Sequence, residues 1–354
     1  MTRRKVVAFI CAAGLGAGLW FVSPRARTLD LPPRLSDQAF WKLVVDASEP
    51  GGYFRSQDIT NLTSNELGFQ LVIPELIRRT TPGRPGRVYL GVGPEQNFTY
   101  IAAVRPKMAI IFDIRRGNLD MQLLYKAIFE LSQDRADFVG MLFGRLRPRG
   151  VGSASTAAEL FRALEPMPRS DAVYRQHLAA IENQLAKVHA FALRPADLAA
   201  IRTIYETLYY SGVAIRSYPT YADLMTATDD EGTARGFLAT EESFTFLKDL
   251  ESRNLVVPVV GDFAGPKAIR AVGAYLKTAG ATVSAFYLSN VEQYLVGGTW
   301  ETFCRNVATL PLDGASTFIR SANSGGVGFG RGGGFVSRLG AITEEVSHCG
   351  GRQR

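Results

Sequence analysis

The chain has 354 residues, of which 46% are hydrophobic, and its formal net charge is +7. This composition is that of a globular protein with enough apolar side chains for one large domain or two small ones. Much of the positive charge flanks the apolar N-terminus, and no long basic run interleaves with aromatic residues, so the sequence gives no nucleic-acid-binding signal. The three histidines and three cysteines lie too far apart for a His/Cys zinc motif, and we expect no metal site.

The N-terminus carries a targeting signal. Residues 6–22 contain no charge and follow the basic stretch Thr-Arg-Arg-Lys, as in a signal peptide or a signal anchor. Pro24 and Arg25 interrupt any small-residue cleavage site, which favours an uncleaved anchor. We therefore expect residues 1–22 to contact the membrane and residues 23–37 to form a linker. The basic residues are more numerous before the apolar run than after it, which favours an exported, periplasmic domain and leaves the cytosolic face as the alternative.

Residues 38–354 predict one α/β domain. Ser36 or Asp37 is placed to cap a helix over 38–49, and a second helical segment covers 65–80. Apolar strands follow at 87–90 and 108–114, with a short helix over 97–105 between them. The second strand is apolar on both faces, as a buried parallel strand is. Asn118 then opens a helix that presents a stripe of leucine and isoleucine side chains.

The alternation of strands and helices is broken over residues 134–239. Two amphipathic helices are predicted there, over 171–191 and 195–212. We interpret this region as a helical insertion that forms a lid or a side layer. The alternation then resumes, with helices over 241–254, 267–279 and 299–309, strands over 256–263, 282–290, 316–322 and 335–342, and a Gly-rich loop over 324–334. The predicted fold is a doubly wound, mostly parallel α/β sheet of the Rossmann type.

Polar residues follow four of the predicted strands. In a doubly wound sheet, ligands bind outside the carboxyl ends of the strands. The candidates for cofactor binding are Gly91, Gly93, Glu95, Asp113, Gly261, Asp262, Phe263 and Ser289. The glycines allow close backbone approach, and the two aspartates could accept hydrogen bonds from a ribose and an adenine. Each has a structural alternative: a tight turn for the glycines, a pair with Arg115 or Arg116 for Asp113, and a helix cap for Asp262.

The order LGVGPE, IIFDIR, VVGDF and FYLSN resembles the pattern of class I S-adenosylmethionine-dependent methyltransferases. The resemblance implies that Gly91 and Gly93 cradle the methionine part, that Asp113 binds the ribose, that Asp262 contacts the adenine, and that Ser289 and Asn290 face the methyl group and its acceptor. It makes Asn290 and Tyr287 the candidates for the catalytic position. The chain is also similar to a family of uncharacterised bacterial proteins with a methyltransferase-like fold.

The first motif departs from that pattern, because Pro94-Glu95 replaces its last glycine and Pro94 has no N–H to donate. We expect S-adenosylmethionine-dependent methyl transfer to a small or membrane-associated acceptor. The alternative is a non-catalytic, membrane-tethered α/β protein with a changed or vestigial nucleotide site, since S-adenosylmethionine is cytosolic and an exported domain would lack it. An NAD(P)-dependent oxidoreductase is less favoured, because Gln96 stands where its motif needs glycine or alanine.

Overall fold

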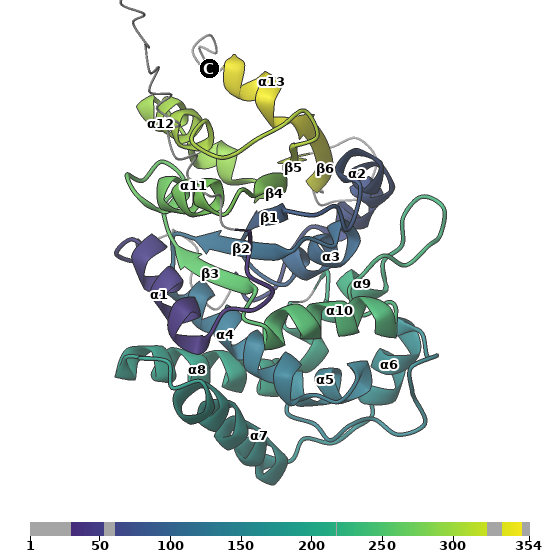
Figure 1. Cartoon of the computed structure of the whole chain (residues 1–354). Helices are drawn as coiled ribbons and strands as arrows, with labels where there is room; N and C mark the ends of the chain where they lie inside the picture. The colour runs from purple at the N-terminus through teal and green to yellow at the C-terminus, as the bar shows by residue number, and fades with distance from the viewer. Residues whose placement is uncertain (1–29, 53–60, 217, 324–334, 349–354) are drawn as a thin grey trace, which may run out of the picture.

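The computed structural model describes residues 30–52, 61–216, 218–323 and 335–348 (Figure 1). Six strands form one sheet in the order β3-β2-β1-β4-β5-β6, and β6 alone runs antiparallel, against β5. The strands are β1 (Arg87–Val92), β2 (Met108–Asp113), β3 (Val256–Val260), β4 (Thr282–Ser289), β5 (Thr317–Asn323) and β6 (Phe335–Ala341). Every residue of β1, β2 and β3 is buried, as expected for central strands covered on both faces.

Helices cover both faces of the sheet (Figure 1). One face carries α3 (Gln96–Val104), α4 (Arg116–Leu131) and α10 (Glu241–Ser252), and the other carries α1 (Asp37–Ala47), α11 (Ala268–Thr278) and α12 (Gly298–Val307). The short helix η2 (Leu67–Val72) and α2 (Ile73–Thr80) lie beside β5 and β6, and α13 (Ile342–Ser347) follows β6. The chain changes face between β3 and β4, so β1 and β4 flank the point where the strand order reverses.

Five further helices lie in the chain between α4 and α10, and four of them, α5 to α8, lie below α10 in Figure 1. Helix α8 packs along α4, and α7 contacts both of them. The five are α5 (Arg135–Leu142), α6 (Ala157–Leu164), α7 (Asp171–Asn183, extended by a π-turn over Gln184–Val188), α8 (Pro195–Ser211) and α9 (Tyr221–Thr226).

The expectation of a doubly wound, mostly parallel α/β fold is confirmed. Ser36 caps α1 by accepting a hydrogen bond from the Ala39 backbone N–H. The expected single helix over 65–80 is wrong in detail. A 3₁₀ turn precedes α2, because Pro74 can enter a helix only in its first turn. Helix α4 begins two residues before Asn118.

The predicted apolar anchor over residues 6–22 and the Gly-rich loop over 324–334 lie outside the described residues. Within the described ranges, no helix combines the length and the apolar character that a membrane span requires.

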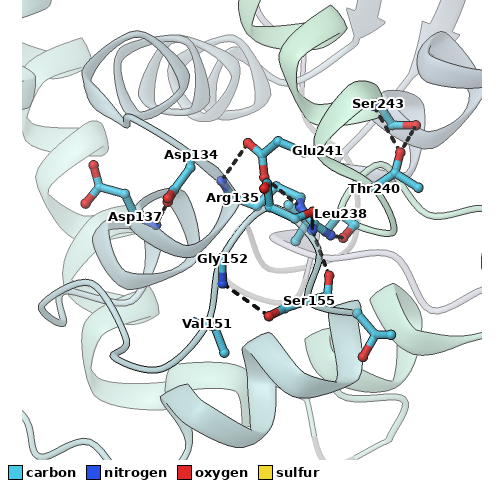
Figure 2. A network of polar contacts seen from close by, with 12 residues as sticks. Asp134, Arg135, Asp137, Val151, Gly152, Ser155, Leu238, Thr240, Glu241 and Ser243 are labelled. Atoms are coloured by element: carbon cyan, nitrogen blue, oxygen red, sulfur yellow. Dashed lines mark hydrogen bonds and ion pairs between the residues drawn. The ribbon is translucent and has the colours of Figure 1, made fainter.

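A buried arginine ties the helical insertion to α10 (Figure 2). Arg135, which is 1% exposed, pairs with Glu241 at 2.9 Å. Its guanidinium also donates to the backbone carbonyl oxygens of Leu238, Ser153 and Ser155 at 2.7–2.9 Å. These bonds join the start of α5, the loop before α6 and the turn before α10, so one side chain satisfies acceptors from three segments.

We expect Arg135→Met to destabilise the fold by about 3–5 kcal/mol, because it leaves three carbonyl groups without this donor and leaves Glu241 with only the backbone N–H at position 135. Urea unfolding followed by circular dichroism measures this loss. The control is Arg147→Met, since Arg147 makes a partly exposed pair with Asp134. That pair should contribute about 1 kcal/mol or less. Equal urea midpoints for Arg135→Met and Arg147→Met would contradict the prediction that Arg135 stabilises the fold more than Arg147 does.

Candidate functional site

A cavity of about 370 Å³ opens at the carboxyl ends of β1, β2, β3 and β4, at the point where the strand order reverses. We call it the main cavity. Segments far apart in sequence converge on it, including a loop, residues 61–66, that precedes η2. Of the residues predicted from the sequence, the main cavity is lined by Gly93, Asp113, Gly261, Asp262, Phe263, Tyr287, Ser289 and Asn290.

Gly91 and Glu95, which the sequence predicts to contribute to a cofactor cradle, are not among the residues that line the main cavity. A Cβ atom on Gly91 would lie 1.9 Å from Asn97 Oδ1 and 2.8 Å from the Tyr89 hydroxyl oxygen. Gly91 is therefore needed for the packing of these two side chains, which hydrogen-bond each other at 2.9 Å. Gly93 does face the cavity, and its φ of +78° is one that glycine adopts without strain.

Glu95 is the N-cap residue of α3, and its side chain is held by a distant loop rather than by the helix N–H groups. It is fully buried, and both of its carboxylate oxygens accept from the Ser64 backbone N–H, at 3.0 and 3.2 Å. Its own backbone N–H also donates to it. Burial raises the pKa of Glu95 to about 7, although these donors and nearby Arg216 favour the ionised form. The Asn97 and Phe98 N–H groups at the start of α3 donate to the backbone carbonyl oxygens of Pro94 and Glu95, so the Glu95 carboxylate is held by the loop and by its own N–H.

A second glutamate closes the start of α11 in the same way. Glu49, just beyond the end of α1, accepts from the backbone N–H groups of Lys267 and Ala268 at 2.8 Å and of Asp262 at 3.1 Å. The Asp262 side chain accepts from the Ala264 backbone N–H at 2.8 Å, two residues on. Asp262 therefore forms a local turn at the cavity wall, and Glu49, rather than Asp262, caps the helix.

Asp113 makes the ion pair that was its structural alternative. Its two carboxylate oxygens accept from Arg115 Nε at 3.1 Å and Nη2 at 2.9 Å, and from the Arg115 backbone N–H at 2.8 Å. Both side chains are 7% exposed and both line the main cavity. A ribose at this strand end would meet a carboxylate whose charge is already balanced by a neighbouring guanidinium.

The sequence interpretation missed Glu66. It lies in the loop over residues 61–66, is 2% exposed and lines the main cavity. Glu66 Oε1 accepts from Ser289 Oγ at 2.6 Å, and Oε2 accepts from Gln96 Nε2 at 2.9 Å and from the Ser321 hydroxyl. No motif marks this residue in the sequence, because its partners lie on β4, α3 and β5 and only the fold brings them together.

Ser289 has a strained backbone at the end of β4. Its φ is +50°, which non-glycine residues seldom adopt, and its pairing with β5 is irregular. The hydrogen bond to Glu66 fixes its side chain on the cavity wall. Such strain is concentrated at functional sites, where the surrounding structure maintains it.

Tyr287 and Asn290 flank Ser289, and both line the main cavity. Tyr287 is 2% exposed and lies beside Tyr100, with ring centroids 5.1 Å apart. Burial raises the pKa of Tyr287 well above its ordinary value, and Glu66 adds to the effect. Tyr287 therefore stays neutral and can donate a hydrogen bond, but it is not a base near neutral pH. In the described part of the chain, no three His, Cys, Asp or Glu side chains gather closely enough to hold a metal ion.

Fold and site together define a doubly wound α/β protein with a ligand-sized cavity where the strand order reverses. Residues 61–339 match the model of a family described as a domain of unknown function (DUF7790). The match covers more than half of the chain, so the chain belongs to this family. No curated protein shows significant similarity to the chain.

We expect the stability difference between wild type and Glu95→Gln to depend on pH. The pKa of Glu95 is raised on folding, so its contribution is fully present below the unfolded pKa and is lost as the pH rises through about 7. Relative to the Glu95→Gln variant, wild type should lose about 3 kcal/mol between pH 4 and pH 8. Urea unfolding of both proteins at a series of pH values measures this difference in the free energy of unfolding. Contributions from other titrating groups are common to both proteins and cancel. A difference that does not change with pH would contradict the raised pKa.

Proposed function

We propose that this chain is a methyltransferase-like protein that binds S-adenosylmethionine in the main cavity and transfers its methyl group to a small or membrane-associated acceptor. The observation that carries the proposal is the convergence of Gly93, Asp113, Asp262 and Ser289, from four successive strand ends, on one cavity. The methyltransferase pattern in the sequence assigns these same positions to the methionine, ribose, adenine and methyl parts of the ligand.

The charges of the cavity support a cationic ligand without phosphate. Its wall carries three acidic residues, Glu66, Asp113 and Asp262, and two arginines, Arg115 and Arg216. Glu49 accepts from the N–H groups at the start of α11, where a pyrophosphate would otherwise bind, and a second acid, Glu95, is buried at the start of α3. S-adenosylmethionine has a positive sulfonium and no phosphate, whereas NAD carries two phosphates. The same charges therefore disfavour the oxidoreductase alternative.

Positioning is the main catalytic contribution that this site can make. A sulfonium is intrinsically reactive, so aligning the acceptor with the methyl group supplies much of the rate enhancement. Ser289 and Asn290 lie at the strand end assigned to the methyl group, and the neutral Tyr287 can orient an acceptor by donating a hydrogen bond. Glu66 lies within hydrogen-bonding distance of Ser289 and places a negative charge on this part of the wall.

The second candidate is a non-catalytic, membrane-tethered protein whose site has changed its ligand. The ion pair between Asp113 and Arg115 favours it, because a ribose would have to compete with a buried guanidinium. Cys304 also favours it, because this residue is disulfide-bonded. Disulfide bonds persist mainly in oxidising compartments, where a cytosolic methyl donor is not supplied. Tethering through residues 6–22 belongs to this proposal as well.

Calorimetric titration of the full-length chain with S-adenosylmethionine, its demethylated product and NAD tests the proposal. We expect both adenosyl compounds to bind and NAD not to bind. Glu66→Gln keeps an acceptor for Ser289 but removes a negative charge. It should therefore weaken the binding of S-adenosylmethionine at least tenfold. The binding of its demethylated product, which lacks the sulfonium charge, should weaken much less.

The control is Asp46→Asn, which neutralises an exposed acid on α1. This variant should bind both adenosyl compounds as wild type does. If none of the three compounds binds to wild type, the methyltransferase proposal is wrong and the non-catalytic candidate remains. If Glu66→Gln weakens both adenosyl compounds equally, the assigned interaction with the sulfonium is wrong.

A further inference from the structure

A second cavity, of about 190 Å³, lies between the start of α4, the middle of α8 and residues 61–62. We call it the side cavity. Asn61 and Arg115 line both the side cavity and the main cavity, so the two are neighbours that share a wall. None of the residues predicted from the sequence as a site residue lines the side cavity.

The walls of the side cavity are mainly apolar. Leu62, Met121, Ala200 and Ile204 contribute side chains from three separate segments. An apolar protein cavity of about 150 Å³ is large enough to hold benzene. The side cavity can therefore take one substituted benzene ring, and it is too small for a nucleoside.

Three residues of the side cavity carry hydrogen-bond acceptors that a ligand could use: Asn118, Thr203 and Thr207. Asn118 is 2% exposed, and its Oδ1 atom is buried without a hydrogen-bond partner among the described residues. Thr203 and Thr207 donate their hydroxyl hydrogens to backbone carbonyl oxygens one turn back in α8, at 3.1 and 2.8 Å. Their lone pairs remain for a ligand. Because the terminal torsion of asparagine is soft, rotation of the amide can present Oδ1 to a donor in the cavity.

The side cavity has one charged residue in its wall, Arg115, which is paired with Asp113. The nearby Arg116 pairs with Asp197 at 2.9 Å. Since these charges are balanced within the protein, the cavity favours a neutral occupant over an ion.

We propose that the side cavity binds a small neutral aromatic molecule that carries a hydroxyl group, a ligand of the phenol class. The ring fills the apolar walls, and the hydroxyl donates to Asn118 Oδ1, which satisfies a buried acceptor that otherwise costs free energy. The occupant lies next to whatever the main cavity holds, across the wall formed by Asn61 and Arg115. This inference stands whether or not S-adenosylmethionine binds.

Fluorine NMR titration of the full-length chain with 4-fluorophenol and 4-fluorotoluene tests the inference. The two probes are similar in size and differ in the hydroxyl. We expect Asn118→Leu to weaken 4-fluorophenol about tenfold and to leave 4-fluorotoluene unchanged. Ala200→Trp fills the cavity and should abolish binding of both probes. The matched control is Ala199→Trp, because Ala199 is exposed on α8 and does not line the cavity.

Thr207→Val removes a hydroxyl from a partly exposed position in the same wall. Because the phenol hydroxyl has a single hydrogen, which Asn118 Oδ1 accepts, this variant should bind both probes about as tightly as wild type does. Thermal unfolding verifies that each variant is folded. Three results would overturn the inference: wild type binds neither probe at millimolar concentration, Ala200→Trp retains both probes, or folded Asn118→Leu binds 4-fluorophenol as tightly as wild type.

Discussion

The hydrogen bond from the Ser64 backbone N–H to the Glu95 carboxylate is the interaction on which the site depends. It closes the first turn after β1 and holds the loop over residues 61–66 against the sheet edge. That loop brings Glu66 to Ser289, at the end of β4. If the loop moved away, a buried carboxylate would lose its donor, and desolvated groups of this kind are costly to leave unpaired. One internal acid therefore positions the residues that line two cavities.

Glu49 is a second internal acid that holds distant segments together at the point where the strand order reverses. It reaches from the end of α1 to the backbone N–H groups that begin α11. The start of α11, which a nucleotide-binding sheet offers to phosphate, is thus neutralised by a glutamate from a segment that precedes β1, and a second acid, Glu95, is buried at the start of α3. Glu49 and the loop over residues 61–66 therefore belong to the site, although the sequence suggests only a linker and peripheral helices before β1. The main cavity lies where a nucleotide would bind in a doubly wound sheet, but its charges favour a cation and disfavour a phosphate.

The sequence predicted what depends on local pattern, and it failed where distant contacts decide. Continuous apolar runs identified β1 and β2, and strand-end polar residues such as Asp262 were correctly expected to converge, because the carboxyl ends of parallel strands share one edge. Glu66 and Glu49 could not be predicted, since their partners come from other elements. Gly91 has a pattern identical to that of a cradle glycine, and only the position of Asn97 shows that it serves packing.

The two functional proposals differ in the cellular compartment that they require, and Cys304 is the residue that bears on the compartment. This residue is disulfide-bonded, and the other cysteines of the sequence, Cys11 and Cys349, lie outside the described residues. A disulfide bond stabilises a domain where thiols are oxidised and is seldom retained in the cytosol. The charges of the main cavity, in contrast, match a cytosolic sulfonium. The disulfide bond and the cavity charges are compatible if an exported protein evolved from an adenosyl-binding ancestor. Its main cavity would then have kept a preference for cations while its ligand changed. The neutral ligand proposed for the side cavity is compatible with both compartments, because its binding does not depend on S-adenosylmethionine.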